Sequence, residues 1–472
     1  MKELDRKQSV QSESAILVGV ELPEHKGNHD NLDELAGLVE TAGAEIVGRL
    51  TQKRSTPDQT TYLGKGKVEQ LELMIRATDA DAVIFDNNLS PAQIRNLETA
   101  LGIKVLDRTE VILDIFSTRA QTHEARLAVE LAQLEYSLPR LKRMWTHLSR
   151  IKAGVGMRGP GEKQLETDRR LVEKRIADLR GELDRVQRRK EREVAARSDR
   201  MTVSLIGYTN AGKSTLLNRL TGSDELAEDK LFATLDTRTR RWQLPGWGPV
   251  LLSDTVGFIR DLPHSLIASF KATLEEARQA DLLLHVADAS NPAALDQIAA
   301  VYKVLEELGI NEKDTILVLN QVDAVAEPGT VDHLKEHYPS AIPVSARTGE
   351  GIAQLSSAVS NALTHHFLDV DVETDVGNGR LMAALAKHGE ILSRTYAEDR
   401  VSLHCRMPRK FLGQLAPDEA RIRMRNTGLE FVRAGEQEGN GHAYANGHAN
   451  GNGHTATNGH APLNGAPHNG TH

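Results

Sequence analysis

The chain of 472 residues is predicted to be a multidomain α/β protein. Three observations indicate this class. Short apolar segments alternate with helical stretches up to about residue 115, two long helical stripes follow, and a second alternating region contains a glycine-rich loop between a strand and a helix. We expect an N-terminal α/β domain in residues 1–115, a helical hairpin in 116–199, a P-loop domain in 200–365, a small α+β domain in 366–434 and a disordered tail in 435–472.

The first 115 residues have the pattern of a small parallel α/β domain. Strands are expected at residues 15–20, 45–47, 82–85 and 104–106, and a helix at residues 32–42. A turn rich in glycine and lysine, residues 61–67, precedes a further helix. Such a turn can bind an anion, but a solvated helix start is the favoured interpretation.

Two long amphipathic helices are expected in residues 116–199. Leucines recur at helical spacing along the first helix, at Leu127, Leu131, Leu134, Leu138 and Leu141. The second helix, at residues 162–196, carries apolar residues at three-four spacing, as in a paired helix seam. Two such helices joined by a loop are expected to pack against each other as an antiparallel hairpin.

The loop between these helices, residues 152–162, is rich in glycine. Basic residues crowd both sides of it, at Arg140, Lys142, Arg143, Arg150, Lys152, Arg169 and Arg170. A solvated helix face is the alternative interpretation, since acidic residues are interspersed. We favour a nucleic-acid contact, because a glycine-rich tip on stiff helices can enter a phosphate-rich crevice.

The glycine-rich loop of the second α/β region is the most specific motif in the chain. Gly207 to Ser214 fits the pattern G-x-x-x-x-G-K-[ST], with an apolar strand before it at 202–206 and a helix after it from Thr215. Backbone N–H groups of such a loop and the following helix N-terminus attract phosphate oxygens. Lys213 is expected to reach the β- and γ-phosphates, and the Ser214 hydroxyl is expected to hold Mg²⁺.

Three later segments predict that the nucleotide is GTP. Asp254-Thr255-Val256-Gly257 ends a strand, where the carboxylate can support the magnesium shell through water and the Gly257 amide can meet the γ-phosphate. Asn320-Gln321-Val322-Asp323 ends another strand, and a carboxylate there can accept both the ring N–H and the 2-amino group of guanine. Adenine lacks this donor pair and is rejected. Ser345-Ala346-Arg347 fits the backbone loop that closes over the base.

Two residues depart from the usual GTPase pattern. Gln321 stands where Lys is usual, so we expect somewhat weaker nucleotide affinity with guanine preference retained. Phe258 follows Gly257 where many GTPases carry a Gln that orients water. One hypothesis is that K⁺ held near Asn210 supplies the missing positive charge; the alternative is that Asn210 supports the loop turn.

A switch threonine that senses the γ-phosphate is expected between the phosphate-loop helix and the Asp254 strand. The segment from Leu231 offers Thr234, Thr237 and Thr239. Composition and spacing alone do not choose among them.

The end of the chain has two different patterns. A helix is expected at residues 379–395, a strand at 401–406 and a short helix within 408–415. From residue 435 the sequence repeats Asn, Gly and His and has too few apolar residues to fold.

The amino-acid composition further limits the class of protein. The net charge of −8 and 26% charged residues are ordinary for a soluble protein, and a single cysteine, Cys405, excludes an internal disulfide. No apolar run has the length of a membrane span and the N-terminus is too polar for a signal peptide, so we expect a cytoplasmic protein without a membrane span.

The sequence resembles the HflX family of GTPases. Residues 156–170, GMRGPGEKQLETDRR, look like the signature of that family, and the segments 207–214 and 232–236 match it too. The resemblance covers about residues 15–434. It implies that Thr234 is the switch threonine and, with Ser214, a magnesium ligand, and that a hydrophobic residue at 258 is a family trait.

The motifs and the resemblance together assign a set of site residues. The catalytic residues are expected to be Lys213, Thr234 and Gly257, and the metal ligands Ser214 and Thr234. The residues expected to bind the nucleotide are Gly207, Tyr208, Thr209, Asn210, Ala211, Gly212, Lys213, Ser214, Thr215, Phe232, Ala233, Thr234, Leu235, Asp236, Asp254, Thr255, Val256, Gly257, Asn320, Gln321, Val322, Asp323, Ser345, Ala346 and Arg347.

The resemblance also implies a task. A monomeric P-loop GTPase with Mg²⁺, and K⁺ on the hypothesis above, would bind GTP and GDP, contact the large ribosomal subunit and its RNA, and be stimulated by it. It would split or rescue stalled ribosomes under stress. Two alternatives stay open: a GTPase of ribosome assembly, and a nucleotide-regulated RNA-binding or remodelling protein.

Overall fold

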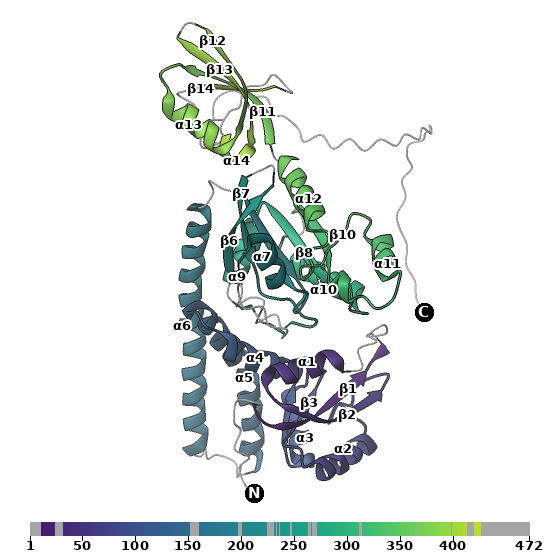
Figure 1. Cartoon of the computed structure of the whole chain (residues 1–472). Helices are drawn as coiled ribbons and strands as arrows, with labels where there is room; N and C mark the ends of the chain where they lie inside the picture. Colours follow the sequence, from purple (N-terminus) through teal and green to yellow (C-terminus); the bar gives the residue numbers. More distant parts are fainter. Residues whose placement is uncertain are drawn as a thin grey trace, which may run out of the picture.

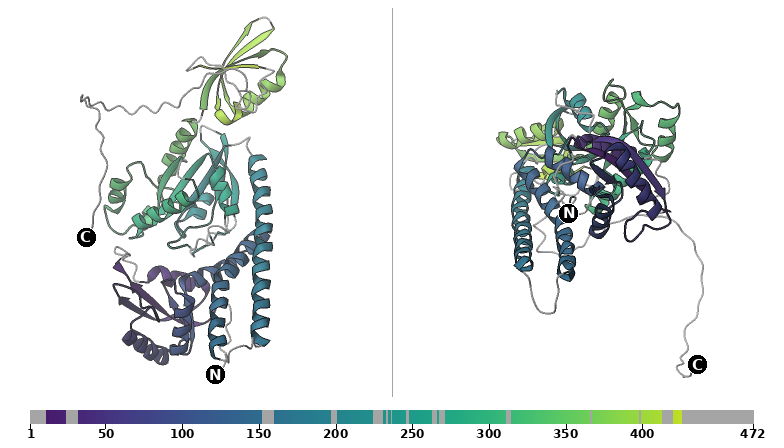
Figure 2. Two further views of the ribbon diagram at one scale, coloured as in Figure 1. Left: turned by 180° about the vertical axis from the view of Figure 1, so that it is seen from behind. Right: turned by 90° about the horizontal axis from the view of Figure 1, so that it is seen from below.

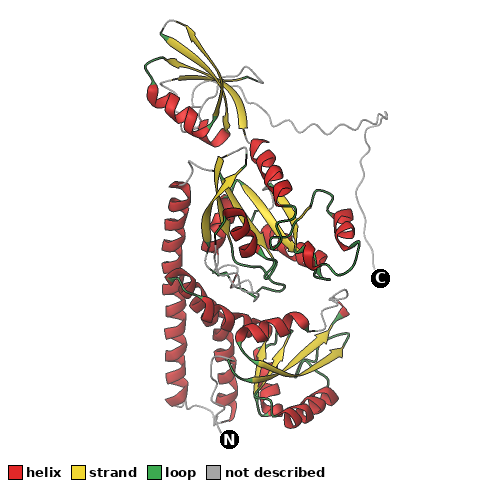
Figure 3. Ribbon diagram, in the orientation of Figure 1, coloured by secondary structure: helices red, strands yellow, loops and turns green. Residues whose placement is uncertain are grey.

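A computed structural model of the chain describes residues 11–23, 32–151, 160–196, 201–223, 231–232, 234–235, 237–245, 248–262, 266, 271–310, 314–365, 367–397, 399–412 and 420–425. Three α/β bodies follow one another along the molecule, and a long helix runs beside the first two (Figures 1 and 2). Helices and strands alternate in the first two bodies, whereas the third is mainly a strand layer (Figure 3).

The N-terminal body is a parallel sheet with helices on its faces. Its strands are β1 (Ser14–Glu21), β2 (Glu45–Lys53), β3 (Ala82–Phe85) and β4 (Lys104–Asp107), in the order β2-β1-β3-β4. Its helices are α1 (Asp33–Ala42), α2 (Lys65–Thr78), α3 (Pro91–Leu101) and α4 (Arg108–Arg119). Six central residues of β1 are buried, which is expected for a strand covered on both faces. The predicted parallel α/β fold is observed.

The helices α5 (His123–Ile151) and α6 (Pro160–Ala196) form the expected pair. Leu127, Leu131, Ile176 and Leu179 are buried together between them. Ion pairs flank this seam, with Arg175 Nε 2.8 Å from Glu130 Oε1 and Arg180 Nη2 2.7 Å from Glu135 Oε1. The glycine-rich tip predicted to contact nucleic acid falls mostly at 152–159, outside the described residues.

The second body is a six-stranded sheet in the order β10-β9-β8-β5-β7-β6. The strands are β5 (Thr202–Gly207), β6 (Arg238–Leu244), β7 (Gly248–Asp254), β8 (Leu282–Asp288), β9 (Thr315–Asn320) and β10 (Ile342–Pro343). Only β6 runs antiparallel to its neighbour within the described sheet. The helices are α7 (Lys213–Thr221), α9 (Lys271–Gln279), α10 (Ala294–Glu307), α11 (Thr330–His337) and α12 (Ile352–His365). Because β5, β7 and β9 are parallel, their carboxyl ends bring three motifs to one edge.

The third body is an antiparallel sheet in the order β12-β13-β11-β14. Its elements are β11 (Phe367–Asp375), α13 (Gly379–His388), β12 (Glu390–Ala397), β13 (Arg400–Pro408), α14 (Arg409–Leu412) and β14 (Ala420–Met424).

The helix predicted for residues 379–395 is wrong in its second half. The helix ends at His388, and Glu390–Ala397 pairs with β13. Gly389 lies so close to β13 that a Cβ atom there would be 2.7 Å from Cβ of Met407. This close approach permits strand pairing at the point where the local pattern favoured continued helix.

Among the helices that the structure describes, none has the length and apolar character needed to cross a membrane.

Candidate nucleotide-binding site

The phosphate loop follows β5 and ends in the first turn of α7. Two of its glycines are required by geometry, since Gly207 has φ 147° and Gly212 has φ 82°. A Cβ atom at Gly207 would lie 2.1 Å from the carbonyl oxygen of Val286, and one at Gly212 would lie 2.3 Å from Nδ2 of Asn320. The loop therefore packs directly on β8 and on the end of β9.

Lys213 is buried inside the curve of this loop. Its Nζ donates to the carbonyl oxygens of Gly207, at 3.1 Å, and Tyr208, at 2.7 Å. Burial lowers the pKa of Lys213 to about 8, although the Asp254 carboxylate acts in the opposite direction. The ammonium group is thus held at the centre of the loop, and a second negative charge there would favour its charged form.

Three oxygen-bearing side chains converge beside Lys213. Ser214 Oγ donates to Asp254 Oδ2 at 2.6 Å and lies 2.8 Å from Thr234 Oγ1, which is 3.2 Å from the same carboxylate oxygen. Oδ1 of Asp254 is buried without a hydrogen-bond partner in the described structure. Burial raises the pKa of Asp254, while Lys213 and the two hydroxyl groups lower it.

This oxygen cluster fits a hard divalent cation. Hydroxyl and carboxylate oxygens are the ligands that Mg²⁺ takes, and P-loop GTPases generally use that ion. The unpartnered Asp254 oxygen can accept a hydrogen bond from a water molecule on such an ion. The donor set therefore agrees with the chemistry expected from the motifs.

The structure distinguishes the three candidate switch threonines. Thr234 is buried and meets Ser214, whereas Thr237 Oγ1 lies 3.5 Å from Nζ of Lys190 and Thr239 donates to Glu276 at 3.0 Å. Only Thr234 among them is thus at the oxygen cluster. Ala233 and Asp236, which were also expected to bind nucleotide, lie outside the described residues.

Two segments are expected to sense the γ-phosphate, and we call them the first switch (the segment around Thr234) and the second switch (residues 257–260). Both are hydrogen-bonded to the phosphate loop. Thr209 Oγ1 accepts from the backbone N–H of Phe232 at 2.7 Å, and the Thr209 N–H donates to the carbonyl of Phe258 at 2.7 Å. Gly257 packs so closely that a Cβ atom there would lie 2.8 Å from Cα of Thr209 and 3.2 Å from Nζ of Lys213. The Gly257 position therefore has no room for a side chain. Phe258 is buried, in agreement with a role in packing.

The expected guanine-binding residues meet at the end of β9. Asn320 Nδ2 donates to the carbonyl of Ala211 at 2.9 Å, and its Oδ1 accepts from the N–H of Ala346 at 3.0 Å. Asp323 accepts from the Ser345 hydroxyl at 2.6 Å. Asn320 thus ties the phosphate loop to the closing loop, and Ser345 orients the carboxylate at the rim.

Gln321 replaces the usual lysine but keeps one of its functions. Its Nε2 donates to the carbonyl of Asn210 in the phosphate loop at 3.1 Å. Gln321 itself has φ 63°, which directs the chain into the short helix η2 (Val322–Ala324). The connection between base site and phosphate loop is therefore retained without a charge.

The remaining residues predicted to bind nucleotide lie around the phosphate loop and the closing loop. Thr215 lies in α7, and Leu235 directly follows Thr234. Thr255 donates to the Leu205 carbonyl at 2.7 Å, and Val256 is buried. Arg347, the last residue of the closing loop, is exposed.

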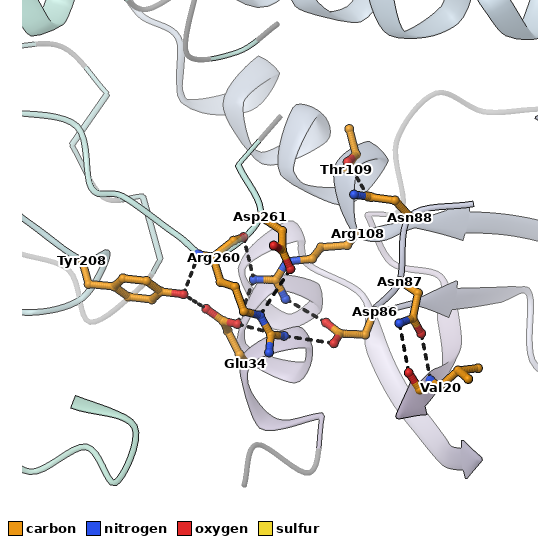
Figure 4. A network of polar contacts seen from close by, with 10 residues as sticks. All are labelled: Val20, Glu34, Asp86, Asn87, Asn88, Arg108, Thr109, Tyr208, Arg260 and Asp261. Carbon is orange, nitrogen blue, oxygen red and sulfur yellow. Dashed lines mark hydrogen bonds and ion pairs between the residues drawn. The ribbon is translucent and has the colours of Figure 1, made fainter. Parts of the chain in front are cut away.

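A polar network that was not predicted joins the site to the N-terminal body (Figure 4). Arg108 of α4 is buried, with Nη1 2.8 Å from Asp86 Oδ1 and Nη2 2.8 Å from Glu34 Oε2. Arg260, three residues beyond Gly257, lies 3.0 Å from Asp86 Oδ2. The carboxylates of Glu34 and Asp86 are thereby shared between two arginines from different bodies.

The same network reaches the phosphate loop through Tyr208. Its hydroxyl donates to Glu34 and accepts from the backbone N–H of Arg260 at 2.7 Å. Burial raises the pKa of Tyr208, and the Glu34 carboxylate adds to this increase. The aromatic rings of Phe116 and Phe232 add an edge contact, with centroids 4.6 Å apart, between α4 and the first switch. No local motif marks these residues, because their partners are far apart in the sequence.

These features define the class of protein. A mostly parallel sheet with a glycine loop at one strand end, an Asp-Thr-Val-Gly segment at the next and an Asn-Gln-Val-Asp segment near Ser345 is the arrangement of a P-loop GTPase domain.

Comparison with known proteins gives the family. The family models that match are "GTP-binding GTPase N-terminal" at residues 29–117, "GTP-binding GTPase Middle Region" at 119–197 and "50S ribosome-binding GTPase" at 202–321. The GTPase HflX of Escherichia coli (strain K12) is 46% identical over 401 residues, 84% of this chain and 94% of that protein. The GTPase HflX of Lacrimispora saccharolytica is 46% identical over 408 residues, 86% of this chain and 96% of that protein. The chain belongs to the HflX family of GTPases.

The chain is also similar to a solved structure. A crystal structure of the SsGBP and GDP complex is 25% identical and covers 75% of this chain and 99% of that chain, with a TM-score of 0.43. The family assignment rests on the sequence relatives. The chain is therefore a GTP-binding enzyme that hydrolyses GTP to GDP and phosphate.

Proposed function

We propose that this GTPase binds the large ribosomal subunit and acts in splitting or rescue of stalled ribosomes under stress. The observation that carries the proposal is the match of residues 202–321 to the family described as "50S ribosome-binding GTPase". The long pair α5 and α6 supports it, because it gives the domain a stiff extension with basic residues near its tip.

The site residues take the following roles in the proposal. Lys213 contacts the β- and γ-phosphates, and the Gly257 N–H meets the γ-phosphate. Asp323 accepts from guanine, while Ala346 and Arg347 close over the base through the loop that Asn320 orients. The contacts of Asn320 with Ala211 and Ala346 support this arrangement, since they hold the phosphate loop and the closing loop at a set separation.

Mg²⁺ is assigned to the oxygen cluster at Ser214 and Thr234, with Asp254 supporting it through water. The ion would neutralise charge on the β- and γ-phosphates. Thr234 connects this cluster to the first switch, and its hydroxyl contact with Ser214 supports that assignment. Loss of the γ-phosphate would then release Thr234 and Gly257 together, which makes the two switches respond to the nucleotide.

K⁺ near Asn210 is proposed to supply positive charge during hydrolysis, because Phe258 cannot orient water. Asn210 lies in the phosphate loop with φ 60°, so its side chain is carried on a sharply turned backbone at the phosphate site. We expect hydrolysis to be faster in KCl than in NaCl at equal ionic strength. Equal rates in the two salts would eliminate the K⁺ hypothesis and leave Asn210 as a turn residue.

The decisive experiment is GTP hydrolysis with and without purified large ribosomal subunits, in K⁺ buffer, beside a Lys213→Ala control. Strong stimulation that the control loses is expected. Intact GTP binding without stimulation would contradict a ribosome-activated enzyme.

The ribosomal task needs a separate measurement. Sedimentation profiles of 70S particles with added protein are expected to show splitting into subunits. Accumulation of precursor particles in depleted cells, with no splitting, would instead favour a role in ribosome assembly.

A further inference from the structure

The C-terminal sheet has one covered face and one polar face. Val370, Val372, Leu403, Cys405 and Met407 point to the covered face, where they share a core with the helices α13 and α14. Alternate residues point the other way. A hollow of about 300 Å³ lies among nine of them, which we call the outer face: Asp371, Glu373, Ser393, Thr395, Ser402, His404, Arg421, Arg423 and Arg425.

All nine residues around this hollow are of polar or charged types. Hydroxyl groups come from β12 and β13, carboxylates from β11 and guanidinium groups from β14 and the residue after it. Small-ligand sites that take apolar molecules are lined mainly by hydrophobic and aromatic side chains. The outer face therefore fits a ligand that offers many hydrogen bonds.

The guanidinium groups form a row along an edge strand. Arg421, Arg423 and Arg425 occupy alternate positions, so they point to the same face at a spacing of about 7 Å. All three are exposed. Among the described strands, β14 has a neighbour on one side only. Planar guanidinium groups bind phosphate oxygens through paired N–H donors.

His404 adds a donor to this row. Arg425 Nη1 lies 2.6 Å from His404 Nδ1, and because arginine only donates, Nδ1 must accept and Nε2 carries the proton. That Nε2 atom is buried and makes no hydrogen bond in the described structure, and Asp369 Oδ1 lies 4.0 Å away, beyond hydrogen-bond distance. A buried donor without a hydrogen bond is costly, and an acceptor supplied by a ligand would reduce that cost.

The carboxylates decide between classes of anionic ligand. Asp371 lies opposite Arg423 and Glu373 opposite Arg421 in the strand register. The side chains of an acidic peptide offer acceptors only, so these two carboxylates would repel them. RNA offers phosphate acceptors for the arginines and, in its 2′-hydroxyl and base amino groups, donors for the carboxylates.

We propose that the outer face of the C-terminal sheet is a second RNA-binding site, which takes single-stranded RNA with phosphates on the arginine row and ribose hydroxyls on Asp371 and Glu373. This extends the proposed ribosomal function, because ribosomal RNA would be the source of the ligand. The outer face lies in a different body of the molecule from the nucleotide site.

The test uses the full chain and a fluorescein-labelled 12-nucleotide RNA of mixed sequence, beside DNA of the same sequence. Anisotropy titrations over a KCl series compare R421Q/R423Q with R380Q/R394Q, a matched loss of two arginines that are exposed in the same body but do not line the hollow. R421K/R423K keeps the charge and removes the paired donors.

We expect R421Q/R423Q to bind RNA about 10-fold more weakly and to lower the slope of log K against log salt by about 1.4, since each single-strand phosphate contact contributes about 0.7. The lysine variant should be intermediate and R380Q/R394Q unchanged. D371A/E373A should reduce the preference for RNA over DNA. Thermal unfolding of each variant checks that the sheet is folded.

Several results would overturn the proposal. These are unchanged affinity and slope in R421Q/R423Q, an equal loss in R380Q/R394Q, or tighter binding of a labelled poly-glutamate peptide than of RNA. Stimulation of wild-type hydrolysis by large subunits is measured separately. Its absence would reject the ribosomal function, whereas stimulation with no effect of R421Q/R423Q on RNA binding would reject only the outer-face site.

Discussion

Arg108→Met tests how strongly the N-terminal body is held against the second switch. The Arg108 side chain is 1% exposed and pairs with Glu34 and Asp86 at 2.8 Å each. Burial by itself lowers the pKa of Arg108, but the two carboxylates more than offset this, so the pKa is raised and the group stays charged. Methionine fills a similar stem volume and removes the charge.

The expected cost follows from the two carboxylates that remain. Removing one partner of a buried ion pair costs about 3–5 kcal/mol, because the other charge is left uncompensated. Glu34 and Asp86 are 13% and 21% exposed and keep Arg260, so the lower end applies. We expect a loss of about 3 kcal/mol, roughly a factor of 150 in the local opening equilibrium.

Hydrogen exchange followed by mass spectrometry is the suitable assay, because a chain of several domains need not unfold in one step. In Arg108→Met the protection of backbone amides against exchange should fall in α4 and in β3. Arg49→Met is the matched control: its ion pair with Asp33 is exposed, with side-chain exposures of 41% and 72%, so its cost should be at most about 1 kcal/mol.

A second variant separates charge from packing. Adding Asp86→Asn to Arg108→Met should recover part of the lost protection, because Arg260 then faces one carboxylate in place of two. Equal protection in Arg108→Met and Arg49→Met, or no recovery in the double variant, would refute this account of the network.

Four further predictions concern the nucleotide site. Burial lowers the pKa of Lys213 to about 8, and a bound phosphate favours the charged form of this lysine, so GDP binding should take up a proton above pH 8. In calorimetric titrations the affinity for GDP should therefore fall by up to about tenfold per pH unit above pH 8. A constant affinity from pH 7 to 9.5 would contradict this. Asp323→Asn should weaken GTP about 100-fold in equilibrium binding, because hydrogen bonds from guanine to a carboxylate contribute about 1.5–3 kcal/mol each. Gln321→Ala should raise the GDP dissociation rate about 3- to 10-fold in stopped-flow measurements, because the hydrogen bond from Gln321 to the phosphate loop is lost. An unchanged rate would show that this hydrogen bond does not contribute to nucleotide affinity. Thr234→Ala should reduce Mg²⁺-dependent GTP binding about 10-fold, because Thr234 meets Ser214. Thr237→Ala should leave this binding near the wild-type value, because Thr237 lies beside Lys190. Equal effects of the two variants would show that Thr234 is not the threonine that acts with Ser214.

The sequence was most informative where a function depends on neighbouring residues. The phosphate loop needs Gly207 and Gly212 at set positions in one turn, so its motif can be recognised without knowledge of the fold. The strands β5, β7 and β9 were predicted from short apolar runs, and their parallel order follows from the helices between them. The α5–α6 seam was predicted for the same reason, because helical spacing alone places its leucines on one face.

Local patterns were less reliable where pairing decides the structure. Residues 390–395 were predicted to continue the helix that begins at 379, yet residues 390–397 form β12, because β13 offers a partner strand and Gly389 allows the close approach. Gln321 was expected to weaken the site through its missing charge, and the structure adds that its amide still reaches the phosphate loop.

By itself the sequence determined the catalytic class of this protein. The phosphate motif and the guanine motif are each a continuous run of residues, so each can be recognised, and its ligand inferred, without knowledge of the fold. Composition and spacing left Thr234, Thr237 and Thr239 equivalent, and only the family resemblance implied Thr234. The tertiary structure shows that Thr234 is the one that meets Ser214. The tertiary structure also brings Glu34 and Asp86 to Arg260, each across about 200 residues of sequence. It further places Arg421 and Arg423 of β14, together with Arg425 after it, around one hollow with the carboxylates of β11. Such contacts depend on how separate elements pack, and packing is a property of the whole chain that no local pattern contains.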